Sequence, residues 1–174
     1  MEIRPTSDRL RETLFNVLTA GNPDALTGSV WLDLFAGTGA VGIEALSRGA
    51  MQVNFVENSS AAADVIRKNL QSLGIVEGFR ILQQDVEHAL RRIEQDHVTA
   101  NVVFIDPPYR KGDAYTKTLQ ALAESSLIGP DSVVVVEHEK KFDPGQDFGS
   151  LRSFRQLVQG STELSFYRQN REEN

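Results

Sequence analysis

Short apolar segments and helical patterns alternate along most of the chain. The apolar segments are rich in Val, Ile and Phe, as buried parallel strands tend to be, and they cover Val30 to Phe35, Gln52 to Val56, Phe79 to Gln83, Asn101 to Ile105 and Ser132 to Glu137. The stretches between them carry apolar residues three and four positions apart, as helices do, at Val41 to Arg48, Ala61 to Leu73, Val86 to Gln95 and Tyr115 to Ser125. This alternation predicts an α/β fold: a doubly wound, mostly parallel sheet with helices on both faces.

The two ends of the chain depart from this alternation. Near the start, Ser7 or Asp8 can cap a helix that runs to about Thr19 and carries one apolar face, formed by Leu10, Leu14, Phe15 and Leu18. Near the end we expect a loop from Phe142 to Gly149, followed by an antiparallel hairpin of Leu151 to Val158 with Thr162 to Tyr167. We therefore expect one domain over residues 1–174, in which residues 1–28 form a helical segment before the sheet.

The composition narrows the class of protein. With 24 acidic and 18 basic residues the net charge is -6, so any contact with a nucleic acid is expected to be local rather than spread over the surface. The absence of cysteine excludes disulfides and thiolate metal sites, and the three histidines are scattered, so no metal is expected. The apolar runs are far shorter than a membrane span of about 20 residues, and we see no secretory signal. We expect a soluble, cytoplasmic protein without a membrane partner.

A glycine-rich loop follows the first predicted strand. Its G-x-G-x-x-G pattern, formed by Gly37, Gly39 and Gly42, joins this strand to a helix, as in Rossmann-like cofactor sites where a tight turn approaches the ligand. Glu57 ends the second strand, where a carboxylate can accept both ribose hydroxyls of an adenosine. The loop and Glu57 together predict a site for either a dinucleotide or S-adenosylmethionine.

Further acidic residues favour a positively charged cofactor. Asp33 precedes the loop, and Asp85 follows the third strand, where it can reach an adenine amine or the amino group of the methyl donor. Both also fit the ordinary roles of strand-end and helix-capping residues, and Glu57 can likewise cap the helix that follows it. The residues expected to bind the cofactor are Asp33, Phe35, Gly37, Gly39, Glu57 and Asp85.

The fourth predicted strand ends in Asp106-Pro107-Pro108-Tyr109. Two prolines remove N–H donors and fix the backbone just beyond the strand. The Asp106 carboxylate and the Pro107 carbonyl can accept the hydrogens of a base amine, while Tyr109 stacks on a base that has been flipped out. The alternative is a purely structural turn with Tyr109 lying over the core. We expect Asp106, Pro107, Pro108 and Tyr109 to form the catalytic site.

These motifs resemble the class I amino-methyltransferases of nucleic acids, and one branch of them in particular. The chain is similar to the RsmD family, through the glycine loop, the Asp106 to Tyr109 turn, and the segments Arg4-Pro5-Thr6-Ser7-Asp8-Arg9, Glu12, Leu14 to Asn16 and Glu44 to Ala50. The resemblance implies transfer of a methyl group from S-adenosylmethionine to the N2 amine of a guanine in 16S ribosomal RNA, either free or in a partly assembled small subunit. It also implies that Arg4 to Arg9 lie near the methionine end of the donor or over the active site.

The start of the chain departs from the family pattern. Family members usually carry a basic stretch before the Arg-Pro-Thr motif, and here the chain begins almost on that motif. We therefore expect a lower affinity for RNA than in family members that carry the basic stretch. The remaining basic residues can contact phosphates, although such side chains are often merely solvated; they are Arg4, Arg9, Arg11, Arg110, Lys111, Lys140 and Lys141.

Three other functions fit parts of the pattern. A methyltransferase acting on adenine or cytosine in DNA uses a similar turn, but no segment here is long enough for a separate recognition module. An NAD-dependent dehydrogenase shares the glycine loop and Glu57, but would leave the Asp106 to Tyr109 turn unexplained. A non-catalytic domain that keeps the fold is the third alternative. We expect a monomer.

Overall fold

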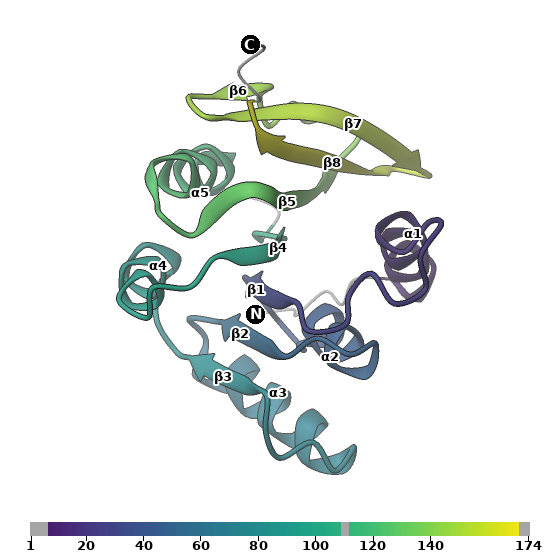
Figure 1. Ribbon diagram of the computed structural model, residues 1–174, viewed down its shortest axis with the longest axis vertical. Helices are drawn as coiled ribbons and strands as arrows, with labels where there is room; N and C mark the ends of the chain where they lie inside the picture. Colours follow the sequence, from purple (N-terminus) through teal and green to yellow (C-terminus); the bar gives the residue numbers. More distant parts are fainter. Residues whose placement is uncertain (1–6, 109–111, 171–174) are drawn as a thin grey trace.

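A single sheet of eight strands runs through the molecule (Figure 1). The computed structural model describes residues 7–108 and 112–170. The strands lie in the order β3-β2-β1-β4-β5-β8-β7-β6. Their bounds are β1 (Val30–Leu34), β2 (Gln52–Val56), β3 (Phe79–Leu82), β4 (Ala100–Ile105), β5 (Ile128–Glu139), β6 (Asp147–Phe148), β7 (Leu151–Gln159) and β8 (Thr162–Gln169). Strands β1 to β5 are parallel, and β8, β7 and β6 extend the sheet with antiparallel pairs.

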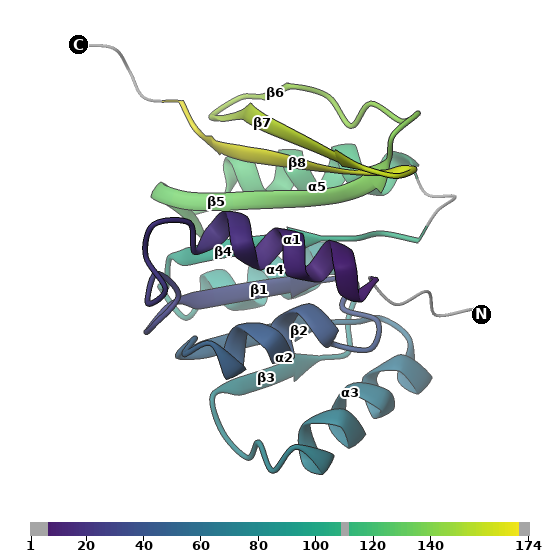
Figure 2. The same cartoon turned by 90° about the vertical axis from the view of Figure 1, so that its right-hand side faces the viewer.

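Helices cover both faces of the sheet, as the alternation predicted (Figure 2). They are α1 (Asp8–Leu18), α2 (Ala40–Ser47), α3 (Ser60–Ser72), α4 (Val86–Glu94) and α5 (Gly112–Glu124). Apolar residues of α1, α2 and α3 form one core cluster with one face of the sheet, and those of α4 and α5 form a second cluster on the opposite face. The predicted α/β fold with its antiparallel C-terminal hairpin is therefore confirmed.

The start of the chain packs as its apolar pattern predicted. Ser7 is the N-cap of α1, and its hydroxyl accepts a hydrogen bond from the Leu10 N–H at 3.2 Å. Phe15 is fully buried and stacks on Trp31 of β1, with 5.5 Å between the ring centroids. Helix α1 is thereby attached to the middle of the sheet.

Two features of the C-terminal half differ from the prediction. The segment from Phe142 to Gly149, expected to be a loop, contains the short strand β6, which pairs with the start of β7. A two-residue strand is too short to show an alternating pattern, so it could not be predicted from the residues alone. Strand β5 begins at Ile128 rather than Ser132. Pro130, Asp131 and Ser132 interrupt the apolar run that marks the rest of the strand, so the apolar pattern does not reveal its first residues.

The strand order creates a crevice at the carboxyl edge of the sheet. From β1 the chain winds outward to β2 and β3, and it then crosses back to place β4 on the other side of β1. Ligands of open α/β sheets bind at such a reversal of strand order. Leu34 and Ile105, the last residues of β1 and β4, are neighbours in this pairing, so the glycine loop and the Asp106 turn leave the sheet side by side.

None of the helices in the described ranges has the length and apolar character needed to cross a membrane.

Candidate functional site

Glu57 connects the glycine loop to the end of β2. Its Oε2 accepts a hydrogen bond from the Gly37 N–H at 2.9 Å, and its Oε1 accepts one from the Ser59 N–H at 3.1 Å. A carboxylate offers about four acceptor positions, so each oxygen can still accept a hydrogen bond from a ligand hydroxyl. Ser59, not Glu57, is the N-cap of α3. Glu57 is therefore not a helix cap, and its carboxylate is held in place beside the loop.

The backbone of the loop adopts conformations that favour glycine. Gly37 and Gly39 have positive φ angles of 57° and 78°, and Phe35, with φ of 57°, is one of the few non-glycine residues in this region. An L residue with positive φ is uncommon and stores strain, which is often found at ligand sites. The half-buried Phe35 side chain packs against the core cluster on the side of α4 and α5. The loop is fixed from the other side by Asn69 of α3, whose side-chain amide donates to the Thr38 carbonyl at 2.9 Å.

The third glycine of the motif has a packing role. A Cβ atom on Gly42 would lie 2.4 Å from Cε1 of Phe55 and 2.8 Å from Cγ1 of Val53. Because real Cβ atoms do not approach other atoms so closely, only glycine lets α2 lie this near to β2. The close packing in turn brings the N-terminus of α2 against the carboxyl edge of the sheet.

Asp33 lies beneath the loop rather than at its surface. It is buried at 2% exposure, and its Oδ2 accepts a hydrogen bond from the Gly42 N–H at 3.0 Å. Burial raises the pKa of Asp33 to about 8; the bond from Gly42 opposes this increase, and the negative charge of Glu57 adds to it. Asp33 is therefore mainly protonated at neutral pH. It supports the N-terminus of α2, where Gly39 provides no capping side chain.

Asp85 is the N-cap of α4. Its carboxylate accepts a hydrogen bond from the His88 N–H at 2.9 Å and lies 2.6 Å from Nδ1 of the His88 ring. These two hydrogen bonds lower the pKa of Asp85, so its carboxylate is charged at neutral pH. The side chain is 54% exposed. Asp85 therefore caps a helix, as one of its two predicted roles required, and part of its carboxylate remains accessible to a ligand.

The turn after β4 begins next to β1. The Asp106 N–H donates to the Leu34 carbonyl at 3.4 Å, and Pro107 is buried while Pro108 is exposed. Asp106 is half-buried. Tyr109, Arg110 and Lys111 lie outside the described residues, as do Arg4, Pro5 and Thr6. The structure therefore brings the predicted Asp106 and Pro107 beside the glycine loop.

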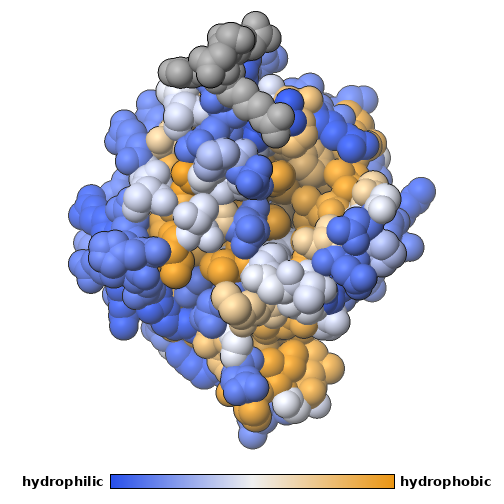
Figure 3. Space-filling view, viewed as in Figure 1, coloured by the Kyte–Doolittle hydropathy of each residue, from blue (hydrophilic) through white to orange (hydrophobic). Residues whose placement is uncertain are grey.

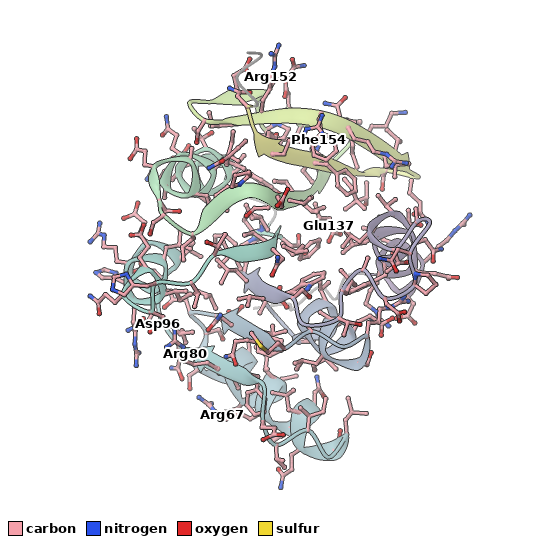
Figure 4. All side chains as sticks on the ribbon, in the orientation of Figure 1. Arg67, Arg80, Asp96, Glu137, Arg152 and Phe154 are labelled. Carbon is pink, nitrogen blue, oxygen red and sulfur yellow. The ribbon has the colours of Figure 1, made fainter. Side chains whose placement is uncertain are left out.

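Glu137, the end of a predicted strand, also lies close to the Asp106 turn. Ile105 and Val136 are neighbours in the pairing of β4 with β5, so the next residues, Asp106 and Glu137, lie next to each other across the two strands. Glu137 is labelled in Figure 4. The Glu137 backbone is held from α5, because the Tyr115 hydroxyl donates to the Glu137 carbonyl at 3.1 Å. Strand pairing is a long-range property, so the sequence offered no signal for this juxtaposition. The same holds for the contact of Asn69 with the loop.

Within the described residues, no three His, Asp or Glu side chains are grouped closely enough to hold a metal ion.

The buried carboxyl of Asp33 predicts a dependence of stability on pH. Its pKa is about 8 in the folded protein and near 3.8 when unfolded, so its contribution to stability is fully present below pH 4 and is lost as pH rises to 8. Asp33→Asn keeps an acceptor for Gly42 and cannot ionise. We expect the free energy of unfolding of Asp33→Asn, relative to the unchanged protein, to rise by up to about 1.4 kcal/mol per pH unit between pH 5 and 7.

Urea denaturation at a series of pH values measures this difference. A difference between the two proteins that does not vary with pH would contradict the assigned protonation of Asp33.

Comparisons with known proteins place the chain in a family. A family model described as "Conserved hypothetical protein 95" matches residues 1–168. YlbH of Bacillus subtilis is 30% identical over 165 residues, which cover 95% of this chain and 87% of YlbH. The ribosomal RNA small subunit methyltransferase D of Escherichia coli is 36% identical over 137 residues, which cover 79% of this chain and 65% of that protein. The chain thus spans less than two thirds of the length of this second relative.

Among solved structures, a conserved protein of Streptococcus pyogenes superposes with a TM-score of 0.77 at 30% identity, covering 92% of this chain and 95% of its own. The fold, the order of the motifs and these matches agree over nearly the whole chain. The protein is therefore a member of the Conserved hypothetical protein 95 family, which is the RsmD family.

Proposed function

We propose that the protein transfers a methyl group from S-adenosylmethionine to the N2 amine of a guanine in small-subunit ribosomal RNA. The observation that carries this proposal is the adjacency of β1 and β4, which sets the glycine loop and Glu57 beside Asp106 and Pro107. The end of β1 leads into the loop proposed for the cofactor, and the end of β4 leads into the acceptors proposed for the amine. The relative from Escherichia coli is named a ribosomal RNA small subunit methyltransferase, which supports the substrate class.

The residues around the loop fit S-adenosylmethionine. Glu57 keeps acceptor capacity on both carboxylate oxygens, as the two ribose hydroxyls of an adenosine require. The loop from Gly37 to Gly42 contains no basic side chain, and the nearby charged carboxylates, Glu57 and Asp85, favour a positively charged ligand. We assign the cofactor to Gly37, Gly39, Glu57 and Asp85, with Asp33 and Phe35 shaping the loop from beneath.

The strand order supports this cofactor over NAD. The Rossmann dinucleotide fold continues its parallel sheet beyond the fifth strand in the order 3-2-1-4-5-6. Here the strand next to β5 is the antiparallel β8, and β7 follows it. The Asp106 turn also has no role in hydride transfer, so the dehydrogenase is the weaker alternative.

Asp106 and Pro107 are suited to hold an amine. The Asp106 carboxylate and the Pro107 carbonyl are hydrogen-bond acceptors. The hydrogen bond from the Asp106 N–H to the Leu34 carbonyl holds the start of this turn against β1. When bound, S-adenosylmethionine supplies a methyl group on a positively charged sulfur, activated for in-line displacement. Acceptors on the amine hydrogens leave the nitrogen lone pair free to point at that methyl group and favour the pyramidal geometry of the transition state. Tyr109 is assigned to stack on the base.

The reaction does not require the protein to remove a proton from the amine before the methyl group is transferred. As the new carbon–nitrogen bond forms, the amine nitrogen gains positive charge and its hydrogens become more acidic. Asp106 stabilises this charge and can take the proton afterwards, so it does not need to remove a proton beforehand. Positioning of the base is therefore the main contribution of the chain to the rate.

Glu137 provides a physical reason for guanine rather than adenine. In β5, Val136 packs into the cluster on the side of α4 and α5, so the next side chain, Glu137, points to the face that carries α1. Glu137 is also in register with Leu164, which lies in the cluster on that face. Strand β5 is about 5 Å from β4, so Glu137 lies beside Asp106.

The hydrogen-bonding edge of guanine matches this pair. Guanine presents two neighbouring donors there, N1–H and the N2 amine, whereas N1 of adenine is an acceptor that a carboxylate repels. With Asp106 and Pro107 on the amine, we assign Glu137 to the N1–H of the target guanine.

The wider context follows from the same proposal. We propose that residues 1–174 act as one domain and as a monomer, in the cytoplasm, on ribosomal RNA that is either free or part of a small subunit under assembly. A DNA amino-methyltransferase is the second candidate because its turn performs the same chemistry. A non-catalytic domain is the third, and the ordered Glu57 and Asp106 sites argue against it.

Removing the Asp106 carboxylate tests the proposed chemistry. We expect Asp106→Ala to lower the rate of methyl transfer to ribosomal RNA at least about 100-fold, as loss of a group that stabilises transition-state charge does. Its affinity for S-adenosylhomocysteine, measured by calorimetry, should stay within a few fold of the unchanged protein. Normal turnover by this variant would refute the role of Asp106.

Replacing the target guanine by 2-aminopurine tests the role of Glu137. This base keeps the amine on C2 but has an acceptor at N1, so we expect the unchanged protein to prefer guanine by on the order of 100-fold in kcat/KM. Glu137→Gln offers an amide N–H to that acceptor, and the preference should fall to about tenfold or less.

Glu139→Gln is the matched control, because Glu139 is exposed on the same strand and face. It should leave the preference unchanged. An equal preference in the Glu137→Gln variant and the unchanged protein would remove Glu137 from base recognition.

A further inference from the structure

The hairpin of β7 and β8 carries a group of arginines around an exposed aromatic ring. Phe154 is 41% exposed, and the Arg168 guanidinium lies over its ring at 4.4 Å from the centroid. Arg152 and Arg155 lie on β7, as Phe154 does, and both are exposed; Arg152 and Phe154 are labelled in Figure 4. We refer to Arg152, Phe154, Arg155 and Arg168 as the hairpin patch. These arginines are not among the basic residues that the sequence motifs marked for phosphate contact.

Strand pairing puts all four side chains on one face. Arg155 is in register with Phe166, which belongs to the core cluster on the side of α1, and Arg168 follows Phe166 by two positions. Arg152 is paired with Arg168. A bulge between Ser153 and Arg155 turns the Phe154 ring to this face as well, 6.2 Å from the Phe166 ring. No described helix covers this part of the face, since α1 lies over β4 and β5 (Figure 2).

The charge of the patch is opposite to that of the whole chain. The chain has a net charge of -6, yet β7 has no acidic residue and the one acid of β8, Glu163, points to the other face, where it approaches His138 at 4.0 Å. The one ion pair that an arginine of the patch makes within the described residues joins Arg152 to Asp147 at 3.5 Å, with both side chains more than two thirds exposed. Like charges placed opposite each other, as Arg152 and Arg168 are, destabilise a strand pair, and a bound anion would relieve that repulsion.

We propose that the hairpin patch binds the RNA substrate beside the target nucleotide, with the arginines on phosphates and Phe154 on a base. This inference rests on the proposed function for the identity of the nucleic acid. Arginine on phosphate and an aromatic ring on a base are the two contacts that bind single-stranded nucleic acid without reading its sequence.

The position of the hairpin allows such a contact. Strand β7 runs parallel to β5, so its turn lies at the same carboxyl edge as Asp106. Gln159, at that turn, accepts a hydrogen bond from the Thr13 hydroxyl of α1 at 2.7 Å. Phe154 is five residues back along β7, roughly 17 Å from the edge at about 3.3 Å per residue. A strand of a few nucleotides spans this distance.

The surroundings favour RNA over a lipid surface. A membrane-binding face needs several apolar side chains that can insert, and Phe154 stands among arginines without them. Val158, which is also exposed, lies on β7 but is in register with Glu163, so it points to the other face of the sheet. The remaining exposed large apolar residues in the described ranges are Met51, Leu73 and Val76, and they lie next to β2, α3 and β3. Figure 3 shows hydrophobic residues at that end and also on the side between α1 and the sheet.

The test is RNA binding by variants of the patch, measured by fluorescence anisotropy with labelled oligouridine and with transcribed small-subunit ribosomal RNA. We expect Arg155→Gln/Arg168→Gln to weaken binding about tenfold and to reduce the slope of log affinity against log salt by about 2 for two lost phosphate contacts. Phe154→Ala should weaken binding about fivefold or more through lost stacking.

The matched control is Arg91→Gln/Arg92→Gln on α4, which removes two exposed arginines from the opposite face. It should change the affinity less than twofold. All variants should keep the melting temperature and the affinity for S-adenosylhomocysteine, which excludes a folding defect.

The proposal would be overturned by unchanged affinity and salt slope in the patch variants, by an equal loss in the α4 control, or by binding to phosphatidylglycerol vesicles in preference to RNA. Self-association of the patch variants with unchanged RNA binding would also overturn it, since charges on an outer strand then serve to prevent aggregation. Because binding is measured without catalysis, patch-dependent RNA binding by a protein that transfers no methyl group would refute the proposed function alone.

Discussion

At the centre of the sheet, β1 pairs with β2 on one side and β4 on the other, and the geometry of the site depends on this position. The reversal of strand order opens a crevice at the carboxyl ends of β1 and β4. The loop after β1 takes its shape from Glu57 at the end of β2, while Asp106 after β4 is tied to the last residue of β1. We propose that the cofactor and the amine of the substrate meet at this crevice.

The acidic residues near the glycine loop differ in charge and in function because they differ in burial. Glu57 and Asp85 reach solvent and accept backbone N–H bonds, whereas Asp33 is buried, accepts a hydrogen bond from the Gly42 N–H and is mainly neutral at pH 7. Burying a charge without a partner costs more than burying a protonated carboxyl. Asp33 thus supports the helix terminus without adding a third negative charge at the loop.

Much of this architecture could be predicted from the sequence. Buried parallel strands are mostly apolar, so the predicted bounds of β1, β2 and β4 agree with the structure to within a residue, and the glycines and Glu57 mark the loop. The strand β6 could not be found because it has two residues, and the early start of β5 was hidden by polar residues. The protonation of Asp33, the place of Glu137 beside Asp106 and the hairpin patch depend on contacts between distant segments, which local sequence patterns do not encode.

We propose that the loop between β1 and α2, with Glu57, holds S-adenosylmethionine. Calorimetric titration of the protein with S-adenosylhomocysteine, with NAD in parallel, tests this assignment. We expect binding of S-adenosylhomocysteine but not NAD, and an affinity at least about tenfold weaker in Glu57→Gln, since a hydrogen bond to a charged group contributes about 1.5 to 3 kcal/mol. Binding of NAD alone, binding of neither compound, or an unchanged affinity in Glu57→Gln would contradict it.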